Sequence, residues 1–514
     1  MGQLYPAILT VRLMSLHEET KKKKEQMKTS KKILYAILIL ILFQGACIVA
    51  CTAHYPIYPK EGSVDRQLQY QVAAKLKQAL SDEVLVVLCF SGGGTRAASM
   101  SYGVIEALQA IELPARPTTQ AQGQTPSKKT LLDEVKVIMS VSGGSFTAAY
   151  YGLHGKDIFK SFREEFLLRD VQSDLFWLAM NPFNWPRIFA AQFSRSDFAQ
   201  EYYDEVLFKG ATLGDMIRKE GPLITILATD AVEGISFSFV PSRFNLLCSD
   251  YDRFPVSRAV TASSAFPGPF TPIVLKNYAG HCDYKVPEWV RKAVEKPDLS
   301  SRVYWMASSL YLYTDATAKP YIYLIDGGIS DNLGVRGLLE TVAGQGGLRS
   351  AMAQSGLSDV RKVAFVIVDA QTRVRQGTML GDIPGLEFVL GSTYSIMINR
   401  NSFETVDLLQ RYIHDWKAED VAAGRKPLDV YIVHLNFDSL PDKKERDYFH
   451  DIPTALSLPE EQVDKLRDVA GRLLYSNEQF RKLVTDIGGN IPVKTGQSDQ
   501  APATPAPAKK EEMR

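Results

Sequence analysis

The chain has 514 residues, which admits one large domain or two smaller ones. Its 59 basic residues balance its 58 acidic ones, so no overall charge favours a nucleic acid or a strongly acidic substrate as partner. Five cysteines in a chain of this length do not make a disulfide scaffold.

The N-terminal segment, residues 1–50, has the outline of an export signal. Seven lysines lie within residues 21–32, before the apolar run ILYAILILILFQGACIVAC. A compact signal would begin at Met27, which makes the residues before it a candidate for an over-extended start. At about 1.5 Å per residue the apolar residues 33–50 reach roughly 27 Å, so an uncleaved membrane-spanning helix is the alternative.

The end of this run resembles the lipobox of bacterial lipoproteins, in which small residues precede a cysteine that is acylated and becomes the mature N-terminus. Ile48-Val49-Ala50-Cys51 carries the resemblance, so Cys51 is the expected lipid anchor. The resemblance implies a body tethered to a bacterial cell envelope. Thr52 stands in place of the aspartate that resembles an inner-membrane retention signal in enteric lipoproteins, so the outer membrane is slightly preferred.

The body of the chain is expected to be one α/β domain. Residues 51–83 are expected to form a proline-containing tether and then a polar helix. From residue 84 apolar runs alternate with helical patterns, which favours a mostly parallel sheet buried on both faces. Strands are expected at VLVVLCF, VKVIMSV, PLITILATD, YIYLIDGG, KVAFVIVDA and LDVYIVHLNF. The domain should cover residues 84–490, with an excursion near 279–319 and a disordered Pro/Ala-rich tail at 491–514.

Three consecutive glycines, Gly92, Gly93 and Gly94, join the first strand to a helical pattern. With Ala97 they fit the G-x-G-x-x-A fingerprint of dinucleotide-binding turns, and Glu112 lies about twenty residues beyond. In such folds the ribose-binding acid ends the second strand, whereas Glu112 ends a helical pattern, so a dinucleotide-binding reductase is the weaker interpretation. The other interpretation is an oxyanion hole, whose bare N–H groups hold a developing negative charge.

An oxyanion hole requires a nucleophile, and the next strand supplies a candidate. VKVIMSVSGGSFTAAYYGL is typical of a strand, a sharp turn and a helix, with Ser142 at the apex of the turn. In a nucleophile elbow, small residues two positions to either side let strand and helix approach each other. Gly144 meets this condition, and Ser140 replaces the other glycine. The competing interpretation makes Ser142 the cap of the following helix.

A base for the Ser142 hydroxyl is expected at Asp326, because a serine is a poor nucleophile until its proton is taken. Asp326 ends the apolar run YIYLI and precedes two glycines, although DGG is also a common turn. A free aspartate has a pKa near 3.9, so this base needs a buried site that raises its pKa by roughly two pH units. His434 is the alternative base, although a histidine within a strand is more often a core residue bonded to backbone.

The blocks SGGGTR, SVSGG and DGG, in this order, resemble the patatin-like phospholipases, which also resemble the catalytic domain of cytosolic phospholipase A2. AVTASSAFPGPFTP, residues 259–272, is similar to a further block of that family. The resemblance implies a three-layer α/β/α sandwich and a serine lipid acyl hydrolase, of phospholipase A or lysophospholipase type, with a Ser142–Asp326 dyad and no cofactor. It also implies oxyanion donors at Gly92 to Gly94 and a basic residue, Arg96, that contacts substrate or supports structure. A non-catalytic lipid-binding protein on the same fold is the alternative of a different class.

The remaining chemistry-bearing residues indicate no further site. The seven histidines show no metal-ligand spacing and no cysteine pair suggests zinc, so no metal is expected. Cys89 lies inside a strand, which leaves Cys248 and Cys282 as a pair that could bridge, a bond that the sequence does not predict. Residues 159–208 are dense in Phe, Trp and Tyr, which favours helical core over an acyl groove or a bilayer contact.

Overall fold

The structure is a computed structural model. It describes residues 84–114, 129–188, 193–373 and 386–492, together with residues 31, 32, 34, 35, 68, 71, 72 and 74–76. Cys51, most of the expected signal and tether, and the tail beyond residue 492 lie outside these residues. Residues 68, 71, 72 and 74–76 are helical, within the stretch where a polar helix is expected. None of the helices among the described residues is long and apolar enough to cross a membrane.

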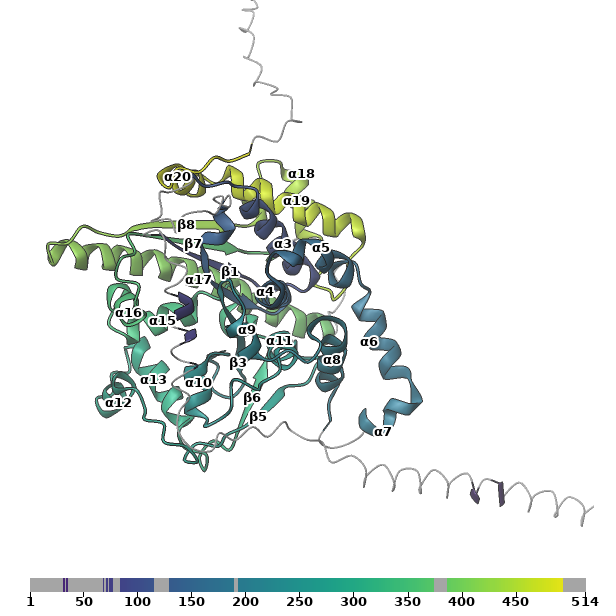
Figure 1. Cartoon of the computed structure of the whole chain (residues 1–514). Coiled ribbons are helices and arrows are strands. Elements are labelled where there is room, and N and C mark those ends of the chain that lie inside the picture. The colour runs from purple at the N-terminus through teal and green to yellow at the C-terminus, as the bar shows by residue number, and fades with distance from the viewer. Residues whose placement is uncertain are drawn as a thin grey trace, which may run out of the picture.

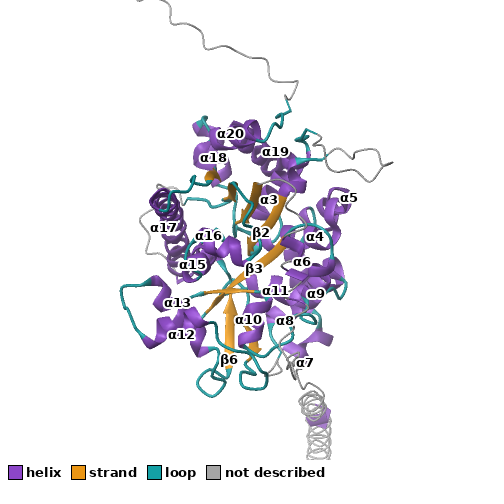
Figure 2. Ribbon diagram, turned by 60° about the vertical axis from the view of Figure 1, so that its left-hand side comes forward, coloured by secondary structure: helices purple, strands orange, loops and turns teal. Residues whose placement is uncertain are grey.

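The domain is a three-layer α/β/α sandwich around one mixed, mostly parallel sheet (Figures 1 and 2). Its strand order is β5-β6-β3-β2-β1-β7-β8, with β4 paired to β3. Five strands are parallel to one another: β1 (Val84–Phe90), β2 (Val135–Val141), β3 (Leu223–Asp230), β7 (Lys362–Val368) and β8 (Asp429–Leu435). Three strands join by antiparallel pairing: β4 (Ser236–Ser238), β5 (Ile273–Lys276) and β6 (Tyr321–Ile325). The short strands β4 and β5 are absent from the sequence prediction.

The central strand β1 shows why the apolar runs form this sheet. All seven of its residues are buried, and their side chains alternate between two cores. Val86, Leu88 and Phe90 face the core under α3 (Thr95–Gln109), α4 (Gly143–His154) and α19 (Glu460–Ser476). Leu85 and Cys89 face the core under α15 (Arg336–Gly344), α16 (Leu348–Gln354) and α17 (Leu386–Ala422). These two sets of helices lie on opposite sides of the sheet in Figure 2.

Shorter elements complete the domain. The other helices are α5 (Ile158–Phe162), α6 (Val171–Met180), α7 (Trp185–Ile188), α8 (Arg195–Tyr203), α9 (Leu213–Arg218), α10 (Pro241–Leu246), α11 (Val256–Ser263), α12 (Glu288–Glu295), α13 (Arg302–Leu312), α14 (Gly328–Asp331), α18 (Lys443–His450) and α20 (Glu478–Asp486). The 3-10 and π segments are η1 (Leu131–Glu134), η2 (Gly155–Asp157), η3 (Arg163–Leu167), η4 (Pro182–Asn184), η5 (Asp204–Phe208) and η6 (Phe437–Ser439). The expected excursion near 279–319 holds α12 and α13 and connects β5 to β6.

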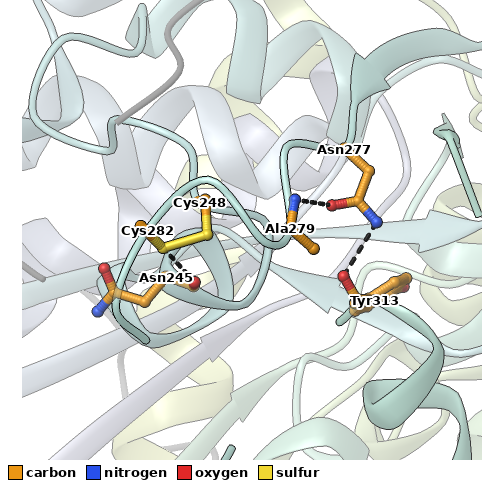
Figure 3. The surroundings of a disulfide bond; sticks show 6 residues. All are labelled: Asn245, Cys248, Asn277, Ala279, Cys282 and Tyr313. Carbon is orange, nitrogen blue, oxygen red and sulfur yellow. Dashed lines mark hydrogen bonds between the residues drawn. A yellow bond between two sulfur atoms is a disulfide. The ribbon is translucent and has the colours of Figure 1, made fainter. Parts of the chain in front are cut away.

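A disulfide fixes the start of this excursion (Figure 3). Cys248 and Cys282, the pair whose bond the sequence does not predict, are bonded, with their Cα atoms 5.6 Å apart. Asn277 holds the same region: its Oδ1 accepts from Ala279 N–H at 2.9 Å, and its Nδ2 donates to Tyr313 O at 2.9 Å. The excursion is therefore tied to the core covalently and by hydrogen bonds.

Candidate active site

Ser142 stands where β2 turns into α4, in the geometry expected of a nucleophile elbow. Its φ is 48° and its ψ is −121°, a conformation that residues with a side chain rarely adopt. The neighbouring glycines allow the tight turn. A Cβ on Gly144 would lie 2.7 Å from Phe90 Cβ, and a Cβ on Gly143 would lie 2.0 Å from Gly94 O. The elbow and the glycine loop are therefore packed backbone against backbone.

Two uncertainties about this turn are resolved by hydrogen bonds. Ser140, which replaces the usual glycine, is fully buried, and its hydroxyl donates to Thr225 O on β3 at 3.2 Å. The extra hydroxymethyl group is thus accommodated by the neighbouring strand. Ser142 occupies the position before α4, but its side chain makes no capping hydrogen bond to the helix. The capping interpretation of Ser142 is wrong.

The Ser142 hydroxyl instead donates to Asp326 Oδ2 at 2.7 Å. The pairing of β2 and β6 with β3 places both residues at the level of Ala228, on opposite sides of β3. Asp326 does follow a strand, as expected, but β6 runs antiparallel to β3. The antiparallel strand β6 thus brings the Asp326 carboxyl to Ser142 from the other side of β3.

The Asp326 carboxyl lies in a desolvated position, with 5% of the residue exposed. Burial raises the pKa of Asp326 to about 6, while hydrogen bonds from the Ser142 hydroxyl and the Gly328 N–H lower it in part. The Gly328 N–H donates to Oδ1 at 2.8 Å. A Cβ on Gly327 would lie 2.3 Å from Leu227 O, which explains the first glycine of DGG. The carboxylate is thus a stronger base than a free aspartate.

Only some of the backbone N–H groups of the glycine loop are available as oxyanion donors. The Gly92 N–H already donates to the backbone O and to Oδ1 of Asn332, each at 3.2 Å. The N–H groups of Gly93 and Gly94 have no hydrogen-bond partner in the part of the chain that the structure describes. The Gly143 N–H, at the start of α4, likewise has none among those residues. The available donors are therefore Gly93, Gly94 and Gly143, and the last of these was not predicted.

Close neighbours explain why the loop carries no side chains. A Cβ on Gly92 would lie 2.7 Å from Asn332 Oδ1. A Cβ on Gly94, whose φ is 61°, would lie 2.2 Å from Ala455 O, and this same carbonyl accepts from Thr95 N–H at 2.9 Å. The residues around Ala455 thus cover the start of α3.

This arrangement does not suit a dinucleotide. A pyrophosphate would bind at the start of the helix, where the Thr95 N–H is bonded to Ala455 O. Glu112 lies in an isolated bridge with Thr130, not at the end of β2. The glycine loop thus lacks a free helix start for the pyrophosphate, and no acidic residue ends β2 to bind the ribose. The structure therefore offers no support for the reductase.

Arg96 makes structural contacts. Its guanidinium donates to Ala370 O at 2.7 Å, to Ile452 O at 2.6 Å and to Thr454 Oγ1 at 3.0 Å. The residue is 2% exposed. It therefore ties the start of α3 to the end of β7 and to the segment that covers the glycine loop.

Ser263, which was not predicted as a site residue, connects three parts of the site. Its hydroxyl accepts from Ser142 N–H at 2.8 Å and donates to Leu227 O at 2.6 Å. Its backbone carbonyl accepts from Gly327 N–H at 3.0 Å. The available signal was its place in the block 259–272, which the resemblance named without a role for any residue.

His434 lies away from the dyad. Its Nε2 is 3.1 Å from Asp369 Oδ2, and its Nδ1 is 3.4 Å from Asn436 Nδ2. Because β8 is three strand spacings from β2, His434 lies about 14 Å from the strand that carries Ser142. It is not a core histidine bonded to backbone either, since with Asp369 it lines a cavity of about 950 Å³. The structure therefore does not bring it to Ser142.

No three His, Cys, Asp or Glu residues within the described ranges are placed to hold a metal ion.

No curated protein sequence matches the chain. Among the solved structures that are similar at low identity are two of one human protein, and the chain spans about two thirds of the length of each. Human GIVD cytosolic phospholipase A2 has 13% identity and a TM-score of 0.38, with 83% of this chain and 67% of that chain covered. The same human protein in complex with methyl gamma-linolenyl fluorophosphonate inhibitor and terbium chloride has 14% identity and a TM-score of 0.31, covering 83% and 65%.

The family is shown by a different comparison. Residues 88–339 match the family model described as patatin-like phospholipase. This range begins in β1 and ends in α15, so it contains the glycine loop, the elbow and the DGG turn. Through this domain the chain belongs to the patatin-like phospholipase family, and it is an acyl-ester hydrolase.

Proposed function

We propose that the protein is a membrane-tethered serine lipid acyl hydrolase in which Ser142 is the nucleophile and Asp326 its general base. The observation that carries the proposal is the 2.7 Å hydrogen bond between the Ser142 hydroxyl, held in a strained turn, and the buried Asp326 carboxyl. Family membership supports lipid as the substrate class. The proposed substrate is a phospholipid or a lysophospholipid.

In the proposed reaction Ser142 Oγ attacks the ester carbonyl carbon while its proton passes to Asp326 Oδ2. The carbonyl oxygen becomes an oxyanion. The free N–H groups of Gly93, Gly94 and Gly143 are the proposed donors of hydrogen bonds to this oxyanion. Asp326 then returns the proton to the leaving alcohol, and the acyl group stays on Ser142. Water gives its proton to Asp326, attacks the acyl-enzyme and releases the fatty acid, and the proton returns to Ser142.

The energetics of the site support a carboxylate base and separate backbone donors for the oxyanion. A pKa near 6 leaves Asp326 mostly ionised at neutral pH, yet makes it a better proton acceptor than a free aspartate. A preorganised oxyanion donor contributes about 3 to 4 kcal/mol of transition-state stabilisation. The chain's own groups therefore supply both the proton transfer and the charge stabilisation that ester cleavage needs.

Labelling with a fluorophosphonate probe tests the nucleophile. Ser309 in α13 is a matched control, because it is 8% exposed and Ser142 is 7% exposed. We expect the wild type and Ser309→Ala to gain one phosphonate, detected by mass, and Ser142→Ala to gain none. Fatty-acid release from phosphatidylcholine and lysophosphatidylcholine vesicles should fall more than 1000-fold in Ser142→Ala.

Two outcomes would reject this function. Equal labelling of Ser142→Ala and the wild type would place the nucleophile elsewhere. A folded wild type with neither labelling nor fatty-acid release would favour a non-catalytic lipid-binding protein on the same fold.

We also propose that a lipid on Cys51 anchors the body in a bacterial cell envelope, with the outer membrane preferred. The lipobox-like residues before Cys51 support the anchor. The Cys248–Cys282 disulfide supports an oxidising compartment. Mass spectrometry of the mature N-terminus should find an acylated Cys51, with processing lost in Cys51→Ala. A mature chain that retains residues 33–50 would instead support the membrane-spanning alternative.

A further inference from the structure

An apolar surface lies on α6, η4 and α7, which run along the outer edge of the molecule (Figure 1). Five large side chains there are exposed: Phe176 by 56%, Trp177 by 69%, Met180 by 50%, Phe183 by 87% and Trp185 by 45%. We call these five residues the aromatic patch. Isolated exposed apolar residues are ordinary, whereas five large ones within ten positions of one segment need an explanation.

The aromatic patch corrects part of the sequence prediction. Helical core was expected for the aromatic residues of 159–208, and Phe162, Phe166 and Tyr203 are indeed buried. The patch is not, because α6 packs against α8 by its other face. The Tyr202 hydroxyl of α8 donates to Asp174 Oδ2 at 2.5 Å, on the packed side of α6. The side chains of the aromatic patch therefore remain largely exposed.

The size and charge of the patch favour a lipid surface over a second protein. No charged residue occurs from Leu175 to Pro186. Taking about 200 Å² for each fully exposed large side chain, the patch presents about 600 Å². A stable protein interface needs about 800 Å² on each partner, and about 600 Å² is already the upper end of what a soluble monomer exposes.

Most of the backbone carbonyls at the C-terminal end of α6 have hydrogen-bond donors within the segment, so they do not depend on water. The last turn of a helix has four carbonyls without a helical partner, and here three are bonded within the segment. The bonds run from Asn181 N–H to Trp177 O at 3.1 Å, from Asn184 Nδ2 to Leu178 O at 2.8 Å and from Trp185 Nε1 to Ala179 O at 3.2 Å. A helix end of this kind keeps its hydrogen bonds when it enters an apolar medium.

We propose that the aromatic patch inserts into the interfacial region of a lipid bilayer and holds the enzyme on its substrate surface. Tryptophan side chains prefer this region, where an apolar ring meets polar headgroups. The arginines beside the patch are paired, Arg169 with Asp174 at 3.4 Å and Arg187 with Glu201 at 2.5 Å. The insertion should therefore not require anionic lipid and should depend little on salt. This inference rests on the proposed function for its substrate.

Contact with lipid tails can be measured on the full chain, reconstituted in phosphatidylcholine vesicles with or without bromine on the acyl chains. Bromine quenches tryptophan emission by contact. We expect strong quenching in the wild type and the loss of at least half of it in the double variant Trp177→Phe, Trp185→Phe. Trp305 on α13 is the matched control, because it is 57% exposed outside the patch. Trp305→Phe should keep the quenching, and equal quenching in the wild type and the double variant would overturn the proposal.

Activity provides a second readout, which separates this proposal from the proposed function. Trp177→Ser with Phe183→Ser should release fatty acid from vesicles about tenfold more slowly. The same variant should hydrolyse a soluble short-chain ester, and react with the fluorophosphonate probe, at the wild-type rate. Equal loss on both substrates would overturn the proposal, as would dimerisation in detergent-free buffer that the patch variant abolishes. Failure of the proposed function appears separately, as absent probe labelling, while the bromine experiment still tests the patch.

Discussion

Two carboxylates lie at the ends of strands in the same sheet, and each holds a hydrogen-bonded partner. Asp326 after β6 accepts from the Ser142 hydroxyl at 2.7 Å, and Asp369 after β7 lies 3.1 Å from His434 Nε2. The first pair is enclosed, whereas the second lines a cavity of about 950 Å³. Both sites therefore contain a carboxylate that contacts a serine or a histidine, so this feature cannot by itself define an active site.

The backbone makes the difference between the two pairs. Ser142 is held at a positive φ, next to free N–H groups of the glycine loop. Beside Asp369 the backbone is already bonded: Ala370 N–H donates to Ser91 Oγ at 2.9 Å, and Ala370 O accepts from Arg96. The first place can stabilise a new negative charge, and the second supports the loop that does so.

Replacing the dyad carboxyl should have the largest effect. Asp326→Asn should lower kcat/KM more than 1000-fold, because the amide cannot take the Ser142 proton. The folded-state pKa of about 6 lies above the ordinary aspartate value of 3.8, so this carboxyl contributes stability below about pH 3.8 that is lost as the pH rises through about 6. Keeping it ionised in the fold costs about 3 kcal/mol. The variant should thus gain about 1 to 3 kcal/mol of unfolding free energy at pH 8 and little at pH 4.

Urea unfolding at the two pH values tests the stability part. An Asp326→Asn variant that is no more stable than the wild type at pH 8 would contradict the desolvated site. If Asp326→Asn retains turnover, Asp326 is not the base, and Asp369 becomes the carboxylate to test next.

Filling the glycine loop should have the next largest effect. In Gly94→Ala the new Cβ would lie 2.2 Å from Ala455 O at a φ of 61°, so the loop or its cover must shift. We expect kcat to fall about 100-fold, since one oxyanion donor moves. Gly210→Ala is the matched control, because Gly210 has a φ of 80° and nothing within 4 Å of the added Cβ. If both variants lose the same activity, backbone strain and not the donor geometry explains the loss.

Removing the hydroxyl of Ser263 should have a moderate effect. Ser263→Ala leaves the Ser142 N–H and Leu227 O without the partner that joins them, so the elbow loses its support. We expect kcat and the rate of probe labelling to fall about tenfold with little change in KM. In the control Ser264→Ala the lost bond is to Val260 O at 2.9 Å, at the C-terminal end of α11 and not to the elbow. An unchanged labelling rate in Ser263→Ala would show that the elbow is positioned without it.

The second pair should matter least. His434→Ala should change kcat/KM by less than threefold, because His434 does not reach Ser142. The fall of kcat/KM below about pH 6 belongs to Asp326 in this account, so its midpoint should stay in place in the variant. A displaced midpoint, measured on a soluble ester between pH 4 and 8, would instead make His434 the titrating base.

Much of this protein follows from local sequence. The strands β1, β2, β3 and β7 are predicted because each is an apolar run long enough to be buried on both faces. The strand β8 is also predicted from an apolar run, but only alternate residues of it are buried, because it lies at the end of the strand order. Ser142 and Asp326 stand out because a reactive side chain beside glycines is a local pattern. The predicted pairing of these two residues agrees with their hydrogen bond.

The tertiary structure decided everything that depends on which distant segments meet. The direction of β6, the Cys248–Cys282 bond, the use of the Gly92 N–H by Asn332 and the place of Ser263 all join residues far apart in the chain. The exposure of the aromatic patch was decided in the same way, since the pattern of α6 does not say which face packs on α8. A sequence records which groups are available, whereas hydrogen bonding and burial depend on partners that only the folded chain brings within reach.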